Sequence, residues 1–308
     1  MKKKSTSLNN ALAILCALCW ISQSQSAAFA ERLYTVTDGN VVNVVDSNAP
    51  AVVLQSDNIT GLAAGETVVG IDYRANGGGI YVVGSGSNFY TMDPNTFAVT
   101  PVGPSAPLSP MLVGNAFAYD YNPSAAGGIL SRIISDTDNN RVLDSTTGGY
   151  FGSVDKTAVE YRSGDANVNA NPNIQGIAYD TNVSGASGTQ QFGIDATLAV
   201  LTTVANNAGT LETIGSLGPA ATGLTDEVAF DISGETNDAF ASLQVGGLSQ
   251  LYGINLDTGA ASLVGTIGLG DTVRGLTVVP LSAIPEPSAL TLLAMASFGL
   301  GIRRRKRS

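Results

Sequence analysis

The chain has 308 residues and a formal net charge of −10, because 25 acidic residues outnumber 15 lysines and arginines, and it contains no histidine. The absence of histidine excludes Ser-His-Asp hydrolases, Cys-His proteases and sites in which histidine binds zinc or iron. The remaining options are carboxylate chemistry, as in glycosidases, and oxygen-ligated Ca²⁺ or Mg²⁺.

The N-terminus has the pattern of a secretory signal peptide. A lysine-rich start precedes an apolar run over residues 11–21, and Ala28 and Ala30 frame a small-x-small cleavage pattern. A membrane-spanning helix needs roughly 20 apolar residues, about twice this run, so we expect cleavage after Ala30 rather than a permanent anchor. Both cysteines, Cys16 and Cys19, lie in this leader, which leaves no thiol for disulfides, nucleophiles or metals in the mature chain.

The body of the chain, residues 31–283, is strongly acidic. It holds 7 basic and 24 acidic residues, a net charge of −17. No basic patch is available to neutralise phosphates, so we do not expect nucleic-acid binding. Such a charge suits a soluble extracellular protein, and it can attract divalent cations or prevent association.

The body is predicted to be all-β. Short runs of β-branched and aromatic residues alternate with turns rich in Gly, Asn, Asp and Ser, and almost no segment shows a sustained 3.6-residue apolar period. The predicted strands cover residues 33–37, 41–46, 68–73, 80–84, 89–93, 117–121, 129–135, 174–179, 191–196, 228–232, 250–256 and 276–280.

These strands recur in four units. Each unit opens with an apolar stretch that ends in an aspartate, and these residues are Asp72, Asp120, Asp180 and Asp231. A second strand and a turn of the Asp-x-x-Thr-Gly type follow, as in residues 93–96 and 255–259. In such a turn the acidic or amide side chain caps its own turn and Gly supplies a positive φ. We therefore interpret the repeated residue as a turn former of a β-hairpin.

Units of roughly 40 to 50 residues with four short strands are typical of β-propeller blades. A body of 253 residues holds five or six such units. The pieces at 33–54 and 272–280 can supply the first and last strands of one shared sheet, which would close the ring and hide its edges. The sequence therefore predicts a five-bladed β-propeller, and six blades, a β-sandwich or two smaller β domains also fit these strands.

One hairpin loop offers alternating oxygen ligands. The candidate ligands are Asp136, Asp138, Asn140 and Asp144. An EF-hand calcium loop requires Gly at its sixth position and Glu at its twelfth, where this chain has Arg141 and Thr147. We therefore favour a loop of good turn formers, with Ca²⁺ as the alternative, and we expect no other cofactor.

The C-terminus forms a tail with three parts. Pro285, Glu286 and Pro287 precede an apolar stretch over residues 289–302, and a basic end follows. The basic residues are Arg303, Arg304, Arg305, Lys306 and Arg307. This order closely resembles the PEP-CTERM sorting signal of bacteria that make extracellular polysaccharide.

The resemblance implies a role for each part of the tail. The Pro-Glu-Pro motif is recognised, the apolar helix enters the membrane and the basic end stays on the cytoplasmic side. An exosortase, which is a membrane transpeptidase-like enzyme, then cuts near the motif. An ordinary tail anchor is the alternative, although 14 apolar residues are few for a permanent span.

The body also resembles a known family. The phrases that carry the resemblance cover residues 33–34, 68–74, 80–81 and 135–143. They are similar to an uncharacterised family of exported bacterial proteins, a domain of unknown function often found with PEP-CTERM tails. The resemblance implies a propeller-like fold and no activity. We therefore divide the chain into a signal peptide (1–30), a propeller-like domain (31–283) and a sorting tail (284–308).

Two functions are compatible with these features. The first is a non-enzymatic cell-surface or extracellular-matrix protein that binds polysaccharide or another surface protein after its tail is processed. The second is a carbohydrate-active enzyme that uses the four repeated aspartates in an axial channel, although equivalence by repeat favours a structural role. The only tryptophan, Trp20, lies in the leader, so it cannot stack on a sugar. We expect the first function and assign no catalytic residue.

Overall fold

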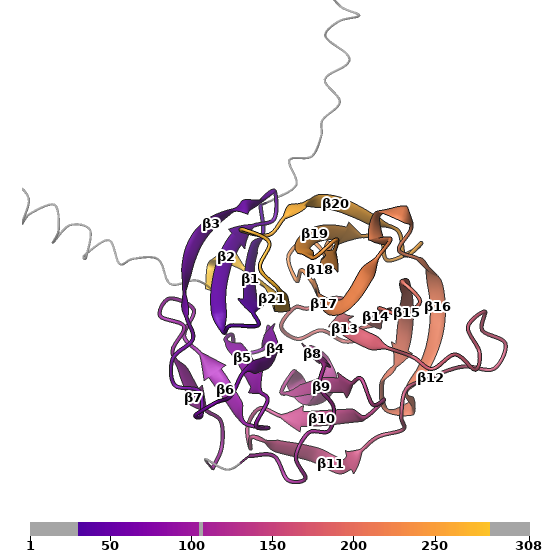
Figure 1. The fold of residues 1–308 in the computed structure, drawn as a ribbon. Helices are drawn as coiled ribbons and strands as arrows, with labels where there is room; N and C mark the ends of the chain where they lie inside the picture. The colour runs from indigo at the N-terminus through magenta and orange to yellow at the C-terminus, as the bar shows by residue number, and fades with distance from the viewer. Residues whose placement is uncertain (1–29, 105–106, 284–308) are drawn as a thin grey trace, which may run out of the picture. The chain divides into compact units, whose positions relative to one another are not determined.

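The structure is a computed structural model that describes residues 30–104 and 107–283. The described body from Glu31 onward is a β-propeller of five blades arranged around a central axis (Figure 1). The prediction of an all-β protein with five blades is confirmed. Each blade is an antiparallel four-stranded sheet whose innermost strand lies at the axis, and one blade carries a fifth, parallel edge strand.

The strands follow the chain around the ring. Blade 1 contains β1 (Arg32–Thr37), β2 (Val41–Asp46), β3 (Ala49–Asn58) and β21 (Val273–Val279), and blade 2 contains β4 (Val68–Tyr73), β5 (Ile80–Gly84), β6 (Phe89–Met92) and β7 (Val99–Pro101). Blade 3 contains β8 (Phe117–Tyr121), β9 (Leu130–Ser135), β10 (Asn140–Asp144) and β11 (Gly149–Asp155).

The last two blades complete the ring. Blade 4 contains β13 (Ile174–Tyr179), β14 (Gln191–Asp195), β15 (Val200–Ala205), β16 (Thr210–Ser216) and the edge strand β12 (Glu160–Tyr161). Blade 5 contains β17 (Leu224–Ile232), β18 (Ala239–Val245), β19 (Leu248–Ile254) and β20 (Ala261–Thr266). Four 3₁₀ turns connect strands or follow them: η1 (Ala125–Gly127), η2 (Asn206–Ala208), η3 (Pro219–Ala221) and η4 (Leu281–Ala283).

Blade 1 closes the ring by combining both ends of the folded body. β21 pairs antiparallel with β1, with Leu33 opposite Val278, so the innermost strand of the blade comes from the end of the domain. This pairing covers an edge of each strand that would otherwise expose unpaired backbone groups. The prediction that the first and last strands share one sheet is confirmed.

The hydrophobic core lies between the blades. Five clusters of buried apolar side chains occur, one at each contact between neighbouring blades. Their members include Val42 and Val82 (blades 1 and 2), Tyr81 and Tyr121 (blades 2 and 3), Ile134 and Ile177 (blades 3 and 4), Ile194 and Phe230 (blades 4 and 5), and Leu251 and Leu33 (blades 5 and 1). A fully buried side chain of this kind contributes about 1.5–3 kcal/mol, so contacts between blades stabilise the ring.

Small residues let the inner strands approach one another. A Cβ atom added to Gly70 of β4 would lie 2.7 Å from Cβ of Tyr119 on β8, and one added to Gly275 of β21 would lie 2.6 Å from Cγ2 of Ile71 on β4. Both distances are far below ordinary van der Waals contact. Glycine at these positions is therefore required for the close packing of neighbouring blades at the axis.

The turns use the chemistry that the sequence predicts. Asp93 Oδ1 accepts hydrogen bonds from the backbone N–H groups of Asn95 (2.9 Å) and Thr96 (2.8 Å). Asn255 caps the corresponding turn of blade 5, where Gly259 has a φ of 81°. The interpretation of these repeated residues as turn formers is confirmed.

The two predicted sorting ends lie almost entirely outside the described residues. Ala28, the Pro-Glu-Pro motif and the basic end lie outside the described residues. Ala30 is described and exposed, and the following Glu31 is buried. Within residues 30–104 and 107–283, no helix has the length and apolar character needed to cross a membrane.

Candidate functional site

Equivalent positions on the five inner strands form a ring at the axis. The residues are Asp72 (β4), Asp120 (β8), Ala178 (β13), Asp231 (β17) and Thr277 (β21). Four of these side chains accept a hydrogen bond from a backbone N–H of the next inner strand. The donor is the residue that directly follows the ring residue of that strand. The bonds run from Tyr121 N–H to Asp72 (2.8 Å), from Tyr179 N–H to Asp120 (2.7 Å), from Val278 N–H to Asp231 (2.6 Å) and from Tyr73 N–H to Thr277 (2.9 Å).

Blade 4 interrupts this pattern and corrects the sequence alignment. Its ring residue is Ala178, which offers no oxygen, and the Ile232 N–H that would face it donates instead to Asp231 Oδ1 (2.6 Å). Asp180, which we expected to be the equivalent residue, lies beyond the end of β13, where its Oδ1 accepts from Gln190 N–H (2.6 Å). A small residue two places before the ring residue, as in Gly176, is the signal that gives the correct alignment.

The three ring carboxyl groups are buried without a counter-charge. Each residue is at most 1% exposed, and none forms an ion pair with a lysine or arginine of the described chain. Burial raises the pKa of Asp72 to about 6, although hydrogen bonds that it accepts lower it in part. Burial, and then the charge of Asp72, raise the pKa values of Asp120 and Asp231 well above the ordinary range.

The oxygens of these groups are incompletely satisfied. Thr277 Oγ1 lies 2.9 Å from Asp72 Oδ1 and 3.0 Å from Asp231 Oδ2, but its single hydrogen can serve only one of them. Asp120 Oδ1 has no N–H or hydroxyl donor among the described residues, and the Asp72 carboxyl group is close enough to share a proton with Asp120. One oxygen from each carboxylate lies within 4.8 Å of one from each of the others, so these residues could share a metal ion.

One end of the axis opens into a small cavity of about 70 Å³. The residues that lie three places before the ring positions line it, and all five inner strands contribute: Val69, Phe117, Gln175, Val228 and Arg274. Asp226 and Glu227 also line this mouth, and Glu227 accepts a 3.4 Å hydrogen bond from Arg274. The mouth therefore carries both charges.

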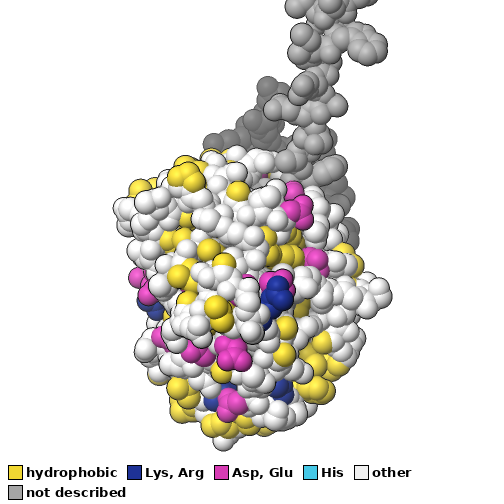
Figure 2. Space-filling model, turned by 90° about the vertical axis from the view of Figure 1, so that its right-hand side faces the viewer, with side chains coloured by type: hydrophobic (Ala, Val, Ile, Leu, Met, Phe, Trp, Pro, Cys, Tyr) yellow, Lys and Arg dark blue, Asp and Glu magenta, His cyan; other side chains and the backbone are white. Residues whose placement is uncertain are grey.

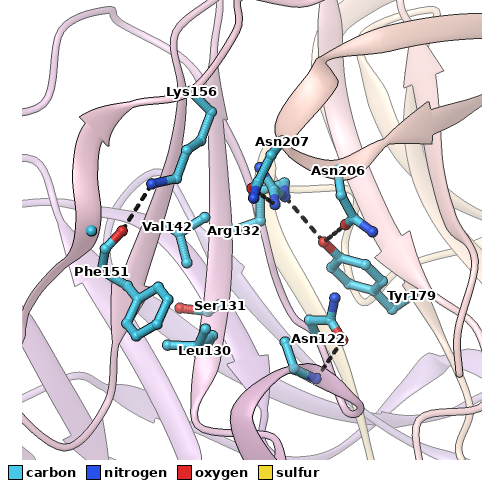
Figure 3. A pocket seen from close by; sticks show the side chains of 12 residues that line it. Asn122, Leu130, Ser131, Arg132, Val142, Phe151, Lys156, Tyr179, Asn206 and Asn207 are labelled. Carbon is cyan, nitrogen blue, oxygen red and sulfur yellow. Dashed lines mark hydrogen bonds between the residues drawn. The ribbon is translucent and has the colours of Figure 1, made fainter. Parts of the chain in front are cut away.

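A larger cavity of about 250 Å³ lies between blades 3 and 4 (Figure 3). Blade 3 supplies Leu130, Ser131, Arg132 and Val142, and the segment that includes β11 supplies Phe151, Gly152 and Lys156. The remaining lining residues are Asn122, Ala125, Tyr179, Asn206 and Asn207. Figure 3 shows Phe151 and Lys156 on one side, and Tyr179, Asn206 and Asn207 on the other. Bulk water occupies about 30 Å³ per molecule, so the cavity corresponds to roughly eight waters.

Arg132 is the centre of a hydrogen-bond network in this cavity. Its side chain is buried, with 5% of the residue exposed, and its Nε donates to the hydroxyl of Tyr179 (3.0 Å). Its Nη2 donates to Asn207 Oδ1 (2.9 Å), and its Nη1 donates to Asn140 Oδ1. The Tyr179 hydroxyl in turn donates to Asn206 Oδ1 (2.6 Å). All partners are neutral, and three of the five guanidinium N–H groups are used.

Lys156 adds a second cation to the same cavity. Its Nζ donates to the carbonyl oxygens of Phe151 (2.8 Å) and Ser153 (2.6 Å). Burial, and then the charge of Arg132, lower the pKa of Lys156. No carboxylate lies among the described residues that line the cavity.

This concentration of positive charge is unusual in the body. Of its seven basic residues, Arg141, Arg162 and Arg274 pair with carboxylates, and two of the other four line this cavity. Figure 2 shows another side of the propeller, where charged side chains of both signs are scattered among uncharged atoms. The cavity between blades 3 and 4 is thus a positive site in a domain of net negative charge.

The structure does not gather the four predicted calcium ligands. Asn140 Nδ2 donates to the carbonyl oxygens of Thr157 and Asn206, so this side chain belongs to the Arg132 network. Asp136 accepts from a backbone N–H, and Asp144 caps its own turn. Among the described residues, the group of three acidic side chains close enough to share an ion is the axial one. Calcium at Asp136, Asp138, Asn140 and Asp144 stays a prediction.

Comparison with known families yields two matches. Residues 41–277 match a domain of unknown function, DUF4394, and residues 283–306 match the PEP-CTERM protein-sorting motif. Both resemblances predicted from the sequence are therefore confirmed. The sorting motif is that of exported, exosortase-sorted proteins of the cell envelope. No curated protein matches the chain.

Solved structures give distant similarities. Hydrazine synthase of Kuenenia stuttgartiensis has a TM-score of 0.37 at 14% identity; the alignment covers 68% of this chain and 53% of that one, about half its length. A chain of a nidogen/laminin complex has a TM-score of 0.46 at 11% identity, with 81% and 98% covered. A putative 6-phosphogluconolactonase of Bacteroides uniformis has a TM-score of 0.35 at 12% identity, with 82% and 72% covered.

Proposed function

Because the chain belongs to the DUF4394 family of domains of unknown function and ends in a PEP-CTERM motif, we propose that it is a non-enzymatic cell-surface protein that binds an acidic saccharide in the cavity between blades 3 and 4. The observation that carries the proposal is the pair of cations in this cavity, Arg132 and Lys156, which have no carboxylate partner among the described residues. An anionic group on the ligand would supply that partner.

The chemistry of Arg132 supports a carboxylate as the recognised group. Two of its guanidinium N–H groups form no hydrogen bond with the described residues, and a guanidinium fork matches the two oxygens of a carboxylate. The site therefore favours an anion over a neutral ligand of the same shape.

The rest of the wall suits a sugar ring. Asn206 and Asn207 offer amide groups to hydroxyls, and Phe151, which is 46% exposed, offers an aromatic face. The volume of about 250 Å³ lies below the usual range of roughly 300–1,000 Å³ for drug-sized ligands. This size fits one acidic sugar unit of a longer chain, with the rest of the polymer outside the cavity.

The residues of the cavity favour ligand binding over glycoside hydrolysis. Glycoside cleavage requires two carboxyl groups about 5–10 Å apart on either side of the bond. No described residue of the cavity carries a carboxylate, and the three axial carboxyl groups are fully buried. The carboxylate-dependent enzyme considered from the sequence therefore lacks an accessible acid pair in this cavity.

The sorting ends would place this binding domain at its site of action. In the proposal, a signal peptidase cuts after Ala30, the apolar part of the tail holds the chain in the inner membrane for a time, and an exosortase processes it near Glu286. An acidic extracellular polysaccharide is the proposed partner, and another surface protein is the alternative. The test of sorting is the intact mass of protein recovered from the cell surface: it should begin at Glu31 and end near Pro287, and a Glu286→Ala chain should stay in the membrane.

Calorimetry with the purified full chain tests the ligand. We expect an oligosaccharide of uronic acids to bind and a neutral glucan of the same length not to bind. Lys156→Gln and Phe151→Ala should weaken binding, and Arg162→Gln, which removes an equal charge from an exposed ion pair on blade 4, should not. Equal binding of neutral and acidic sugars, or equal loss in the Arg162 variant, would contradict the proposal.

A further inference from the structure

We infer that Asp72, Asp120 and Asp231 bind one divalent cation of the Ca²⁺ type at the propeller axis. The inference does not depend on the saccharide proposal, since it concerns different side chains. One oxygen from each carboxylate lies within 4.8 Å of one from each of the other two. Two oxygens on the same Ca²⁺ lie at most about 4.6–5.2 Å apart, which is twice the usual metal–oxygen distance. That limit holds for two oxygens on opposite sides of the ion, whereas three equally spaced oxygens at the same metal–oxygen distance lie about 4.0–4.5 Å apart. A spacing of up to 4.8 Å is therefore close to what a single ion needs.

The negative charge at the axis must be neutralised by a partner. All three side chains are at most 1% exposed, and no lysine or arginine of the described chain pairs with them. Buried carboxylates must be neutralised, either by protons or by a cation, because an isolated buried charge is prohibitively unfavourable. A divalent ion offsets two of three negative charges, and the N–H groups of neighbouring strands stabilise the remainder.

The unpartnered oxygen of Asp120 is a second, separate observation. Asp120 Oδ2 accepts from Tyr179 N–H at 2.7 Å, but Oδ1 has no N–H or hydroxyl donor among the described residues, although the side chain is 1% exposed. The Asp72 carboxyl group is close enough to share a proton with Asp120, so a proton is the alternative to an ion here. Buried polar atoms without a partner are rare in native proteins, and an ion is one cause of them. A cation between the three carboxylates would satisfy this oxygen.

The Thr277 hydroxyl can donate to only one of the two carboxylates that it contacts. Its Oγ1 accepts from Tyr73 N–H and has one hydrogen, which cannot serve Asp72 and Asp231 together. Asp231 keeps a backbone N–H donor on each oxygen in either case, from Ile232 and Val278. If the hydrogen goes to Asp231, Asp72 Oδ1 lacks a donor, and a cation would provide that oxygen with an electropositive partner.

The donor set selects the class of ion. The polar side-chain atoms of the ring are all oxygens, and residues 31–283 contain neither histidine nor cysteine, so soft and imidazole-preferring metals have no suitable ligands. Mg²⁺ prefers an octahedral shell with several waters, whereas Ca²⁺ accepts irregular oxygen cages. The buried, irregular ring therefore favours Ca²⁺.

The ion would act on the fold. Asp72, Asp120 and Asp231 belong to the inner strands of blades 2, 3 and 5, so one ion would connect three of the five blades at the axis. The mouth lined by Asp226 and Glu227 lies three residues before the ring along each strand, roughly 10 Å away. Because the ring side chains are at most 1% exposed, we expect the ion to be taken up during folding.

The test uses the purified full chain, unfolded in denaturant with EDTA and refolded with or without Ca²⁺. After removal of free metal, elemental analysis should find one Ca²⁺ per chain. At a free Ca²⁺ concentration about 100 times Kd, the melting temperature should rise by about 5–10 °C. Asp120→Asn should abolish both results, whereas the control Asp136→Asn, in the loop predicted from sequence to bind calcium, should keep them.

Terbium luminescence gives a readout that does not need a stable variant. Tyr119 and Tyr121 flank Asp120, so Tb³⁺ bound at the axis should be sensitised by tyrosine excitation and displaced by Ca²⁺. A protein that refolds without metal and shows no shift in melting temperature with Ca²⁺ would overturn the inference and leave protons as the neutralising partner. Loss of the metal in the Asp136 variant with retention in the Asp120 variant would also overturn it, and would locate calcium in the hairpin loop.

Discussion

The axis and the cavity between blades 3 and 4 are both polar interiors with unbalanced charge, but of opposite sign. The axis holds three acidic side chains and no basic partner, and the cavity holds two basic side chains and no acidic partner among the described residues. Tyr179 touches both: its N–H donates to Asp120, and its hydroxyl accepts from Arg132. Asp120 and Arg132 lie opposite each other in the β8–β9 pair, yet the side chain of Asp120 lies at the axis and that of Arg132 lies in the cavity.

The difference shows how each type of charge is tolerated. A carboxylate can take up a proton or a metal ion when water is removed, so the axial groups can be sealed completely. A guanidinium cannot lose its proton, so Arg132 is surrounded by neutral acceptors and stays beside a cavity that an anion can enter. The axis is therefore suited to a structural role and the cavity to recognition. The following predictions test this distinction.

The pH dependence of stability should show the largest effect. The pKa of Asp72 is raised in the folded state to about 6, so the metal-free protein binds more protons than the unfolded chain. Its stabilising contribution is complete below about pH 4 and is lost as the pH rises through about 6. The rise of the Asp72 pKa from 3.8 to about 6 corresponds to about 3 kcal/mol, and Asp120 and Asp231 should extend the loss to higher pH. Urea unfolding in EDTA from pH 4 to 8 measures it, and a flat profile would contradict it.

Removing the cavity cation should cost less. Arg132→Met deletes three charge-assisted hydrogen bonds. It leaves the side-chain oxygens of Asn140 and Asn207 without the Arg132 donor. We expect the free energy of unfolding to fall by about 2–3 kcal/mol, from the value of hydrogen bonds to charged groups. The exposed Arg162→Gln should change it by less than about 1 kcal/mol. Denaturant titrations of both variants provide the comparison, and equal effects would show that Arg132 has no special structural role.

Removing an axial charge should have the opposite sign. Asp120→Asn replaces a buried carboxyl group by a neutral one of the same shape, and its amide can donate to Asp72. In EDTA at pH 8 we expect this variant to be more stable than the parent by about 1–2 kcal/mol, because one unpaired buried charge is gone. Thermal unfolding measures the change. A clear loss of stability would mean that the Asp120 charge is already compensated in the metal-free fold.

The smallest effect is expected at the rim of the cavity. Phe151 is 46% exposed, so Phe151→Ala should leave stability nearly unchanged while weakening binding of an acidic oligosaccharide by about tenfold, or about 1.4 kcal/mol. Leu248→Ala, at a similarly exposed apolar residue of blade 5, is the control. Calorimetry on both variants distinguishes a recognition surface from general surface apolarity, and unchanged affinity in the Phe151 variant would argue against stacking.

Local patterns in the sequence predicted most of the fold. Alternation of short apolar runs and turn residues predicted the strands, and the side-chain chemistry of Asp93 and Asn255 predicted their turns, because both effects act over a few residues. The repeat length predicted the blades, and the complementary pieces at the two ends of the body predicted how the ring closes.

The candidate sites could not be predicted to the same extent. The expectation that Asp180 is equivalent to the other three aspartates was wrong. The position of a residue along the inner strand decides whether its side chain faces the axis, and Asp180 lies beyond the end of β13. The small residue two places before each ring residue carries this information, but its meaning appears only when the close approach of Gly70 and Tyr119 is seen.

The sequence by itself thus determined an exported, histidine-free β-propeller with a sorting tail, since these properties depend on composition, local pairing and short motifs. Only the tertiary structure decided which charges meet. Arg132 and Lys156 belong to blade 3 and its outer segment, and Tyr179, Asn206 and Asn207 belong to blade 4, so their cavity exists only where the two blades pack. The axial carboxylates come together for the same reason: ring closure brings strands distant in sequence to within a few ångströms, and no local pattern encodes that distance.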